Sequence, residues 1–244
     1  MNQKVVTIVL IVGLLFSLAA LALQAGAWHL PGNQQGYEPV QPVAFSHRLH
    51  AGEMQIACLY CHSGAEASRH AGIPPASTCM NCHKFVSAPL GALRAEDELA
   101  KKEKRAPQRI VSPEIQKVYD ALALGADLKP DPSRQPAPIQ WLKVHNLPDF
   151  VYFNHAIHIQ KGIGCVSCHG RVDKMPIMWK EEPLTMEWCL ECHRHPERHL
   201  REKREVFNME WAPPVREQLE IGRDLIEREH IEVDRLTNCS VCHR

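Results

Sequence analysis

The sequence predicts a mainly α-helical protein with much irregular structure, attached to a membrane by a helix at its N-terminus. Three observations carry this prediction. Residues 5–23 are apolar and contain no charge, eighteen prolines are spread through the 244-residue chain, and ten cysteines recur in five identical short patterns. Because proline interrupts both helix interiors and sheet ladders, the elements that follow the first helix should be short.

The apolar run at residues 5–23 is long enough, at nineteen residues, to cross a bilayer as one helix. A cleaved signal peptide is the alternative, because the small residues at 24–27 resemble a cleavage site. The run exceeds a usual signal-peptide core, which favours a retained single-pass anchor. Lys4 precedes the run and no Lys or Arg follows before Arg48, so the positive-inside rule predicts a cytoplasmic N-terminus. Trp28 stands where an interfacial aromatic residue is expected.

All ten cysteines lie in five Cys-x-x-Cys-His motifs. Two thiols at this spacing form thioether bonds to one porphyrin, and the adjacent histidine binds its iron. A disulfide scaffold would not place a histidine after every second cysteine, and zinc sites built from such pairs do not require one. The pattern predicts five covalently attached haem c groups. The motif residues are Cys58, Cys61 and His62; Cys79, Cys82 and His83; Cys165, Cys168 and His169; Cys189, Cys192 and His193; and Cys239, Cys242 and His243.

The composition gives no sign of nucleic-acid binding, since 28 Lys and Arg residues balance 28 Asp and Glu residues. The chain also has no glycine-rich phosphate loop and no serine-based nucleophile motif. Five haems in a chain of this length must form most of the apolar interior. We therefore expect the polypeptide to wrap round them in short helices and loops.

A repeat divides the chain. Residues 45–62 and 153–169 both read Phe-x-His-x-x-His, then a short spacer, then a haem motif, and each copy is followed by a second motif. Two dihaem modules are predicted, with a fifth haem at the C-terminus. The expected segments are an N-terminal transmembrane anchor (1–27), the first dihaem module (28–93), a linker with surface helices (94–140), the second dihaem module (141–200), and a C-terminal helix with the fifth haem (201–244).

Two helices are predicted outside the motifs. Ser112 caps the first, which carries an apolar stripe and ends at Gly125. The second covers about residues 215–229 and should lead the chain to the last haem. The charged run at 94–107 is expected to form a solvated helix face, and residues 129–138 should be extended and turn-like.

The paired histidines ahead of the motifs are the first candidates for the sixth ligand of an iron. Residues three apart in a helical turn lie near one another, but two imidazoles cannot bind the same side of one iron. His47 and His50 are therefore expected to bind two neighbouring haems from one short segment, and His155 and His158 to do the same. The phenylalanine ahead of each pair should lie against the porphyrins.

A fifth distal ligand must come from elsewhere. His145, in a segment dense with apolar residues, is preferred, and His70, Met175 and Met186 are alternatives. A methionine ligand would raise the potential of its haem, although packing against a haem is the plainer role for either methionine. Residues expected to face solvent or haem propionates are His195, His199, His230, Arg194, Arg198 and Arg201.

The repeated modules resemble the cytochrome c3/c7 class of multihaem proteins. The larger pattern is similar to the pentahaem cytochrome c component of alternative complex III. It comprises the N-terminal anchor, "CMNCHK" (79–84), "VHNLPDFVYFNHAIH" (144–158), "PLTMEWCLECHR" (183–194) and the terminal "CSVCHR". The resemblance covers nearly the whole chain, and the linker helices are its least distinctive part.

This resemblance implies a membrane-bound quinol:electron-acceptor oxidoreductase of a respiratory or photosynthetic chain. Its partners would be an iron–sulfur subunit, polytopic quinol-binding subunits and a monohaem cytochrome c. The present chain would then be an electron-transfer subunit of the inner membrane, with its haems on the periplasmic side, no substrate site of its own, and a periplasmic electron acceptor. A free-standing anchored donor to a periplasmic reductase is the alternative. A catalytic multihaem reductase is disfavoured, because every motif ends in histidine and none in lysine.

Overall fold

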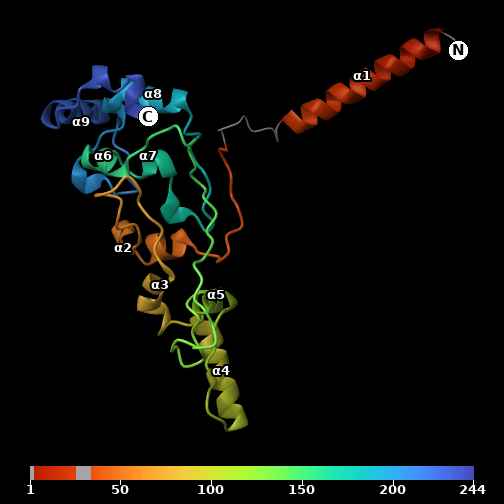
Figure 1. The fold of residues 1–244 in the computed structure, drawn as a ribbon, viewed down its shortest axis with the longest axis vertical. Helices are drawn as coiled ribbons and strands as arrows, with labels where there is room; N and C mark the ends of the chain where they lie inside the picture. Colours follow the sequence, from red (N-terminus) through yellow and green to blue (C-terminus); the bar gives the residue numbers. More distant parts are fainter. Residues whose placement is uncertain (1–2, 26–33) are drawn as a thin grey trace.

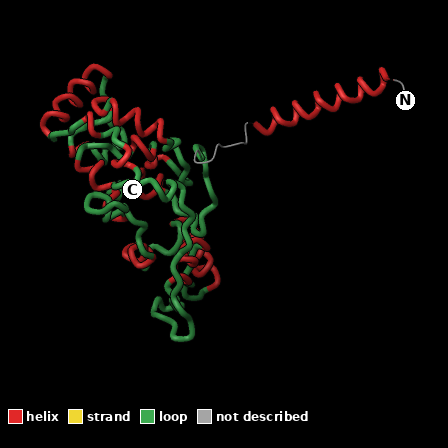
Figure 2. Tube along the Cα trace, turned by 45° about the horizontal axis from the view of Figure 1, so that its top comes forward, coloured by secondary structure: helices red, strands yellow, loops and turns green. Residues whose placement is uncertain are grey.

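The computed structural model describes residues 3–25 and 34–244. Trp28 and His29 lie outside these ranges. Within them the chain consists of helices and loops, with isolated bridges such as Val151–His243 but no β-strand (Figure 2). The predicted class, mainly helical with much irregular structure, is confirmed.

The described residues form ten α-helices, with five short π- or 3₁₀-helical turns and longer loops between them (Figure 1). The helices are α1 (Gln3–Ala25), α2 (Cys58–Cys61), α3 (Ala76–His83), α4 (Leu90–Glu103), α5 (Pro113–Ala121), α6 (His155–Gln160), α7 (Val166–His169), α8 (Met186–Arg194), α9 (Val215–Arg228) and α10 (Cys239–Cys242). The turns are a π-helical η1 (Arg48–Glu53) and the 3₁₀ turns η2 (Val172–Lys174), η3 (Pro196–Arg198), η4 (Lys203–Glu205) and η5 (Val233–Arg235).

Helix α1 contains the whole apolar run predicted from the sequence. Its span Gln3–Leu21 has a mean hydropathy of 2.5 and buries none of its residues against the rest of the chain. The Thr7 and Ser17 hydroxyls donate to carbonyls four residues back, so these polar groups are satisfied within the helix. The length and composition of α1 suit a membrane span, and they would equally suit a signal sequence.

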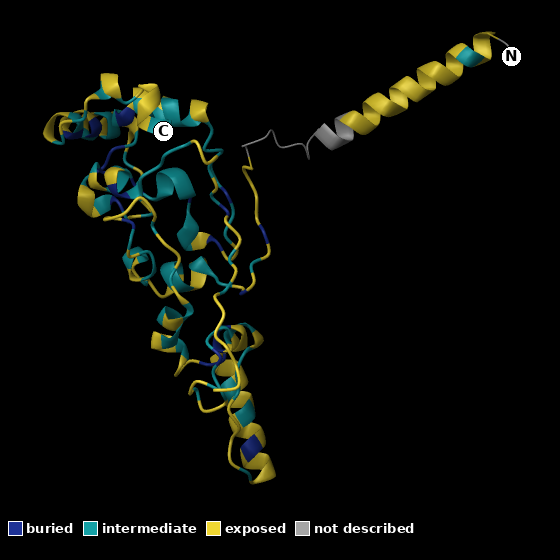
Figure 3. Cartoon of the chain, viewed as in Figure 1, coloured by how far each residue is buried: buried dark blue, intermediate teal, exposed yellow. Residues whose placement is uncertain are grey.

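The helices that carry the motifs follow one another along an elongated body. Figure 1 shows α3, α2, α7 and α8 in succession along the long axis, with α4 and α5 at one end and α9 at the other. Buried side chains are few and scattered, without a continuous core (Figure 3). A chain that packs round large apolar cofactors should show this distribution, because the cofactors take the place of core side chains.

Helix α5 begins where the sequence predicts it. The Ser112 hydroxyl accepts a hydrogen bond from the Ile115 amide at 3.4 Å, and Pro113 opens α5. The helix ends at Ala121, before the predicted Gly125, because Ala123 takes a positive φ and turns the chain back.

Helix α4 carries the charged run, and just beyond its end Arg105 folds back onto it. The guanidinium of Arg105 pairs with the Glu96 carboxylate at 2.5 Å. Hydrogen bonds from Arg105 and from the Gln108 amide hold the pKa of Glu96 at about 2. Most of the charged run therefore forms a solvated helix, as predicted, and Arg105 just beyond the end of the helix pairs with Glu96 on the helix itself.

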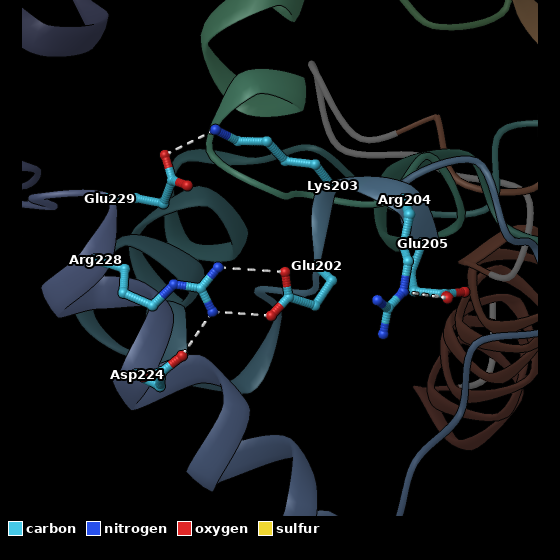
Figure 4. Close-up of polar contacts among 7 residues, drawn as sticks. All are labelled: Glu202, Lys203, Arg204, Glu205, Asp224, Arg228 and Glu229. Atoms are coloured by element: carbon cyan, nitrogen blue, oxygen red, sulfur yellow. Dashed lines mark hydrogen bonds and ion pairs between the residues drawn. The ribbon is translucent and has the colours of Figure 1, made fainter.

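Helix α9 covers nearly the predicted range and lies against η3. The contact is close at Gly222, where an added Cβ would stand 2.0 Å from the Glu197 carbonyl oxygen. Arg228 bonds to Glu202 and Asp224, and Lys203 pairs with Glu229 at 3.0 Å (Figure 4). Exposed pairs of this kind contribute little free energy, but they link the end of α9 to Glu202 and Lys203.

The two repeats interlock through backbone contacts. Turn η1 of the first copy packs against η2, which follows the third motif, and the Arg48 amide donates to the Met175 carbonyl at 2.9 Å. The Ala156 amide of the second copy donates to the Ser68 carbonyl at 3.1 Å. These contacts bring segments far apart in the sequence into one body.

The contact between η1 and η2 requires glycine at position 52. A Cβ there would stand 2.1 Å from the Asp173 carbonyl oxygen, so we expect Gly52→Ala to lower the free energy of unfolding by about 1–3 kcal/mol. Gly91→Ala is the matched control, because an added Cβ at Gly91 in α4 meets nothing within 4 Å. Thermal unfolding of the two variants measures the difference, and equal stability would show that η1 and η2 do not pack this closely.

Candidate functional site

Each Cys-x-x-Cys-His motif occupies a helical turn. In α2, α7 and α10 the histidine amide donates to the carbonyl of the first cysteine of its motif, at 2.9–3.0 Å. In α3 and α8 the motif forms the last part of a longer helix. A helical turn brings both cysteines and the histidine to one side of the backbone, so each motif can present two sulfurs and one imidazole to the same cofactor.

Burial raises the pKa values of most of the ten cysteine thiols. Burial lifts the pKa of Cys165 to about 11 and those of Cys168 and Cys192 to about 12. Residues 3–25 and 34–244 contain no cluster of three or more His, Cys, Asp or Glu side chains placed to hold a metal ion. The thiols are arranged in pairs, as thioether attachment needs.

The two repeats have the same side-chain geometry. Phe45 stacks on His50 with ring centroids 4.4 Å apart at 26°, and meets His47 edge-on at 4.9 Å and 87°. Phe153 stacks on His158 at 4.6 Å and 26°, and its ring meets that of His155 edge-on at 4.8 Å and 89°. The phenylalanine expected against the porphyrins thus fixes the angle between the two imidazoles of its pair.

Each of these histidines faces the histidine of a motif. The first histidine of a pair faces the motif directly after it, and the second faces the following motif. The ring centroids are 6.4 Å apart for His47 and His62, 6.1 Å for His50 and His83, 6.3 Å for His155 and His169, and 6.2 Å for His158 and His193.

This spacing fits one metal ion between two imidazoles. A metal–nitrogen bond of about 2.0 Å on each side, with the radius of a five-membered ring added twice, places two ring centroids roughly 6 Å apart. Rings in direct contact would lie closer, as Phe153 and His158 do. The four facing pairs therefore leave the space that an iron and its porphyrin plane need.

Hydrogen bonds to backbone carbonyls orient six of the eight paired rings. A carbonyl oxygen only accepts, so the Nδ1 atom of each ring must carry the proton and Nε2 keeps its lone pair. Histidine ligands of metals are commonly oriented in this way. The bonds join His50 to Ser46 (2.9 Å), His62 to Gly72 (2.7 Å), His83 to Val86 (2.8 Å), His155 to Arg69 (2.9 Å), His158 to Asn154 (2.8 Å) and His193 to Leu236 (2.9 Å).

Burial keeps several of these imidazoles neutral. It lowers the pKa of His47 to about 4 and that of His169 to about 3, and it also lowers the pKa of His158. The neutral ring is the form that binds a metal. The Nδ1 atom of His47 is buried without a hydrogen-bond partner among the described residues.

The fifth motif has a different environment. His243 forms a backbone bridge with Val151, and the Tyr152 amide donates to the Cys242 carbonyl at 2.6 Å. The ring that faces His243 is that of Phe150, at 5.8 Å and 29°. Within residues 34–244, no imidazole faces His243.

The remaining ligand candidates are spread over the molecule. The ring of His145 lies 4.3 Å from that of His169 at 64°, and its Nε2 atom is buried without a partner among the described residues. His145 therefore joins the third motif, where the ring of His169 also faces His155. Met175 is fully buried, whereas Met186 is 64% exposed at the start of α8.

The polar candidates differ among themselves. His199 and Arg198 both pair with Glu191, and His195 lies 3.6 Å from Glu197. Arg201 is buried, with its guanidinium 5.9 Å from the Trp211 ring centroid. His70 is exposed.

The carbonyls that orient the rings are the part of the site that sequence reasoning missed. Every residue has a carbonyl, and no side-chain pattern marks the six in use. The histidine pairs themselves were predictable from the repeat. Four of the carbonyls lie within ten residues of their histidine, but those of Arg69 and Leu236 reach His155 and His193 only through the tertiary fold.

The five motifs form a row. Burial is the main cause of the raised thiol pKa values, and neighbouring thiols are close enough to add to it. Cys61 raises the pKa of Cys79 in this way, Cys58 that of Cys165, and Cys242 that of Cys189. The thiols of the fourth motif, Cys189 and Cys192, likewise raise the pKa of Cys168. The spatial order of the motifs is therefore second, first, third, fourth, fifth, which agrees with the order of α3, α2, α7 and α8 in Figure 1.

The chain is similar in sequence to known multihaem proteins. Residues 151–244 match the family described as cytochrome c7 and related cytochrome c. A multihaem cytochrome c subunit of menaquinone reductase from Nitratidesulfovibrio vulgaris is 26% identical over 200 residues, which cover 74% of this chain and 79% of the relative. Together with the motifs, these matches make the chain a multihaem c-type cytochrome of electron transfer, with covalently bound haem c.

Proposed function

We propose that the chain is a membrane-anchored periplasmic pentahaem cytochrome c that carries electrons within a quinol:electron-acceptor oxidoreductase of the alternative complex III type. The observation that carries the proposal is the set of four facing imidazole pairs, each spaced for one iron. Two imidazole ligands close both axial positions, which favours electron transfer over substrate chemistry. The name of the N. vulgaris relative, which is a component of a menaquinone reductase, supports a quinone-linked complex.

The chain's residues have separate roles in this proposal. The ten motif cysteines attach five haems, and the five motif histidines bind the irons from one side. His47, His50, His155 and His158 bind four of the irons from the other side. Haem bound in these positions supplies one-electron transfer between ferric and ferrous iron. No facing pair includes His145.

The order of the motifs in the row defines the two ends of the proposed electron-transfer path. The second motif, on α3, ends one side of the row, and the fifth motif, on α10, ends the other. The dihaem modules at 28–93 and 141–200 then meet in the middle, where η1 and η2 pack together. Electrons would enter and leave through the partners that contact the two ends.

The partners follow from the proposed complex. Helix α1 anchors the chain in the inner membrane with the haems in the periplasm, since Lys4 precedes the apolar run and no Lys or Arg follows before Arg48. Polytopic quinol-binding subunits and an iron–sulfur subunit would supply electrons. A monohaem cytochrome c or another periplasmic acceptor would receive them.

The haem count tests the pentahaem assignment. Thioether bonds survive denaturation, so the unfolded chain should keep its haem colour on a gel, and its mass should exceed that of the polypeptide by five haems. The Cys242→Ser variant cannot form the second thioether bond of the fifth motif. A change in its haem attachment would therefore show that the fifth motif carries a haem. A native mass with three or four haems would contradict the proposal.

Replacement of the paired histidines tests the ligand assignment. His155→Ala should convert the haem of the third motif from low-spin to high-spin, and His158→Ala that of the fourth, because each change removes one strong axial ligand. Ferric-state electron paramagnetic resonance should therefore lose a different low-spin signal in each variant. His199→Ala, whose ring pairs with Glu191, should leave all signals in place. Loss of the same signal in both variants would show that the pair does not serve two haems.

Purification of the chain from solubilised membranes tests the complex. We expect the polytopic quinol-binding subunits and an iron–sulfur subunit to purify with it in fixed ratio, and quinol to reduce its haems only in their presence. A chain that purifies alone but donates electrons to a periplasmic reductase would favour the free-standing donor instead.

A further inference from the structure

The fifth motif differs from the other four because no imidazole within residues 34–244 faces its histidine. The ring that faces His243 is that of Phe150, which cannot bind a metal. Other histidines have different positions, since His145 contacts His169, and His195 and His199 lie near carboxylates. A sulfur ligand is therefore the next class to consider.

Met186 lies on the helix that adjoins the fifth motif. It opens α8, one turn before Cys189, and residues three apart in a helix share one face. Its side chain is 64% exposed, whereas Met175 is completely buried. A large apolar side chain that is mostly uncovered, beside a haem attachment site, has the access that a ligand needs.

The C-terminal segment runs along α8. The ring of His193, near the end of α8, donates to the Leu236 carbonyl at 2.9 Å, and η5 packs against the same helix. Figure 1 places the C-terminus beside α8. The fifth motif thus lies beside the helix that Met186 opens.

We propose that the thioether sulfur of Met186 is the sixth ligand of the iron held by Cys239, Cys242 and His243. The inference rests on the proposed attachment of haem to the fifth motif. Because methionine in place of a second histidine raises the reduction potential, the fifth haem is the most readily reduced of the row. Electrons then leave the chain at its C-terminal end.

Met186→Ala tests the assignment. A ferric haem bound by methionine sulfur has a weak far-red charge-transfer band that histidine-ligated haems lack. The native protein should show this band at the intensity of one haem in five, and Met186→Ala should lose it and gain one high-spin haem while its haem count stays unchanged. Met54→Ala is the matched control, since Met54 is 55% exposed but caps η1 near the first motif.

Met186→His keeps the test decisive if the Ala variant fails to fold. It should retain five low-spin haems, lose the far-red band, and shift one midpoint potential downward while the other four stay in place. His145→Ala should leave the band unchanged, because His145 lies with the third motif.

Two results would overturn the inference. One is a native protein with five haems and no far-red band, and the other is a band that persists in Met186→Ala or disappears in His145→Ala. A native protein without covalent haem on the fifth motif would instead overturn the proposed pentahaem function, so the two failures are distinguishable.

Discussion

The hydrogen bond from histidine Nδ1 to a backbone carbonyl is the interaction on which the rest of this structure depends. It fixes the tautomer, so that Nε2 keeps a lone pair, and it fixes the direction in which that lone pair points. Two of the carbonyls come from distant segments, since that of Arg69 orients His155 and that of Leu236 orients His193. The same bonds that prepare the rings for a metal therefore also connect the two repeats and the C-terminal segment.

The chain buries few side chains because it packs round bound cofactors. Few side chains are buried, and the largest fully buried ones lie outside the helices, except Leu225 of α9. Short helices of four to nine residues, such as α2 and α8, are marginal without tertiary contacts. Their stability must come from what they pack against, and covalent haem would supply apolar surface at each motif. Tight backbone contacts, such as Gly222 on Glu197, join the remaining segments.

The arrangement of ligands separates the fifth motif from the other four. Each repeat contributes two imidazoles from one turn, and one phenylalanine sets both of them. The C-terminal motif has no such segment ahead of it, and it lies beside α8, the helix that begins at Met186. A row of haem sites in which four have similar ligands and the terminal one differs has two unequal ends. Electron flow along it can therefore have a preferred direction, which a row of identical sites would lack.

The sequence by itself determined the chemistry. The positions of ten cysteines and five histidines predict haem attachment, the periodicity predicts α5 and α9, and the Phe-x-His-x-x-His repeat predicts two equivalent histidine pairs. Only the tertiary structure decided which rings face each other, the order of the motifs, and that His145 lies with His169 away from His243. The physical reason is that covalent attachment follows local spacing, which the sequence records directly. Which rings face each other depends on how separated segments pack, and the carbonyls that orient His155 and His193 lie 86 and 43 residues away. No local pattern encodes these contacts.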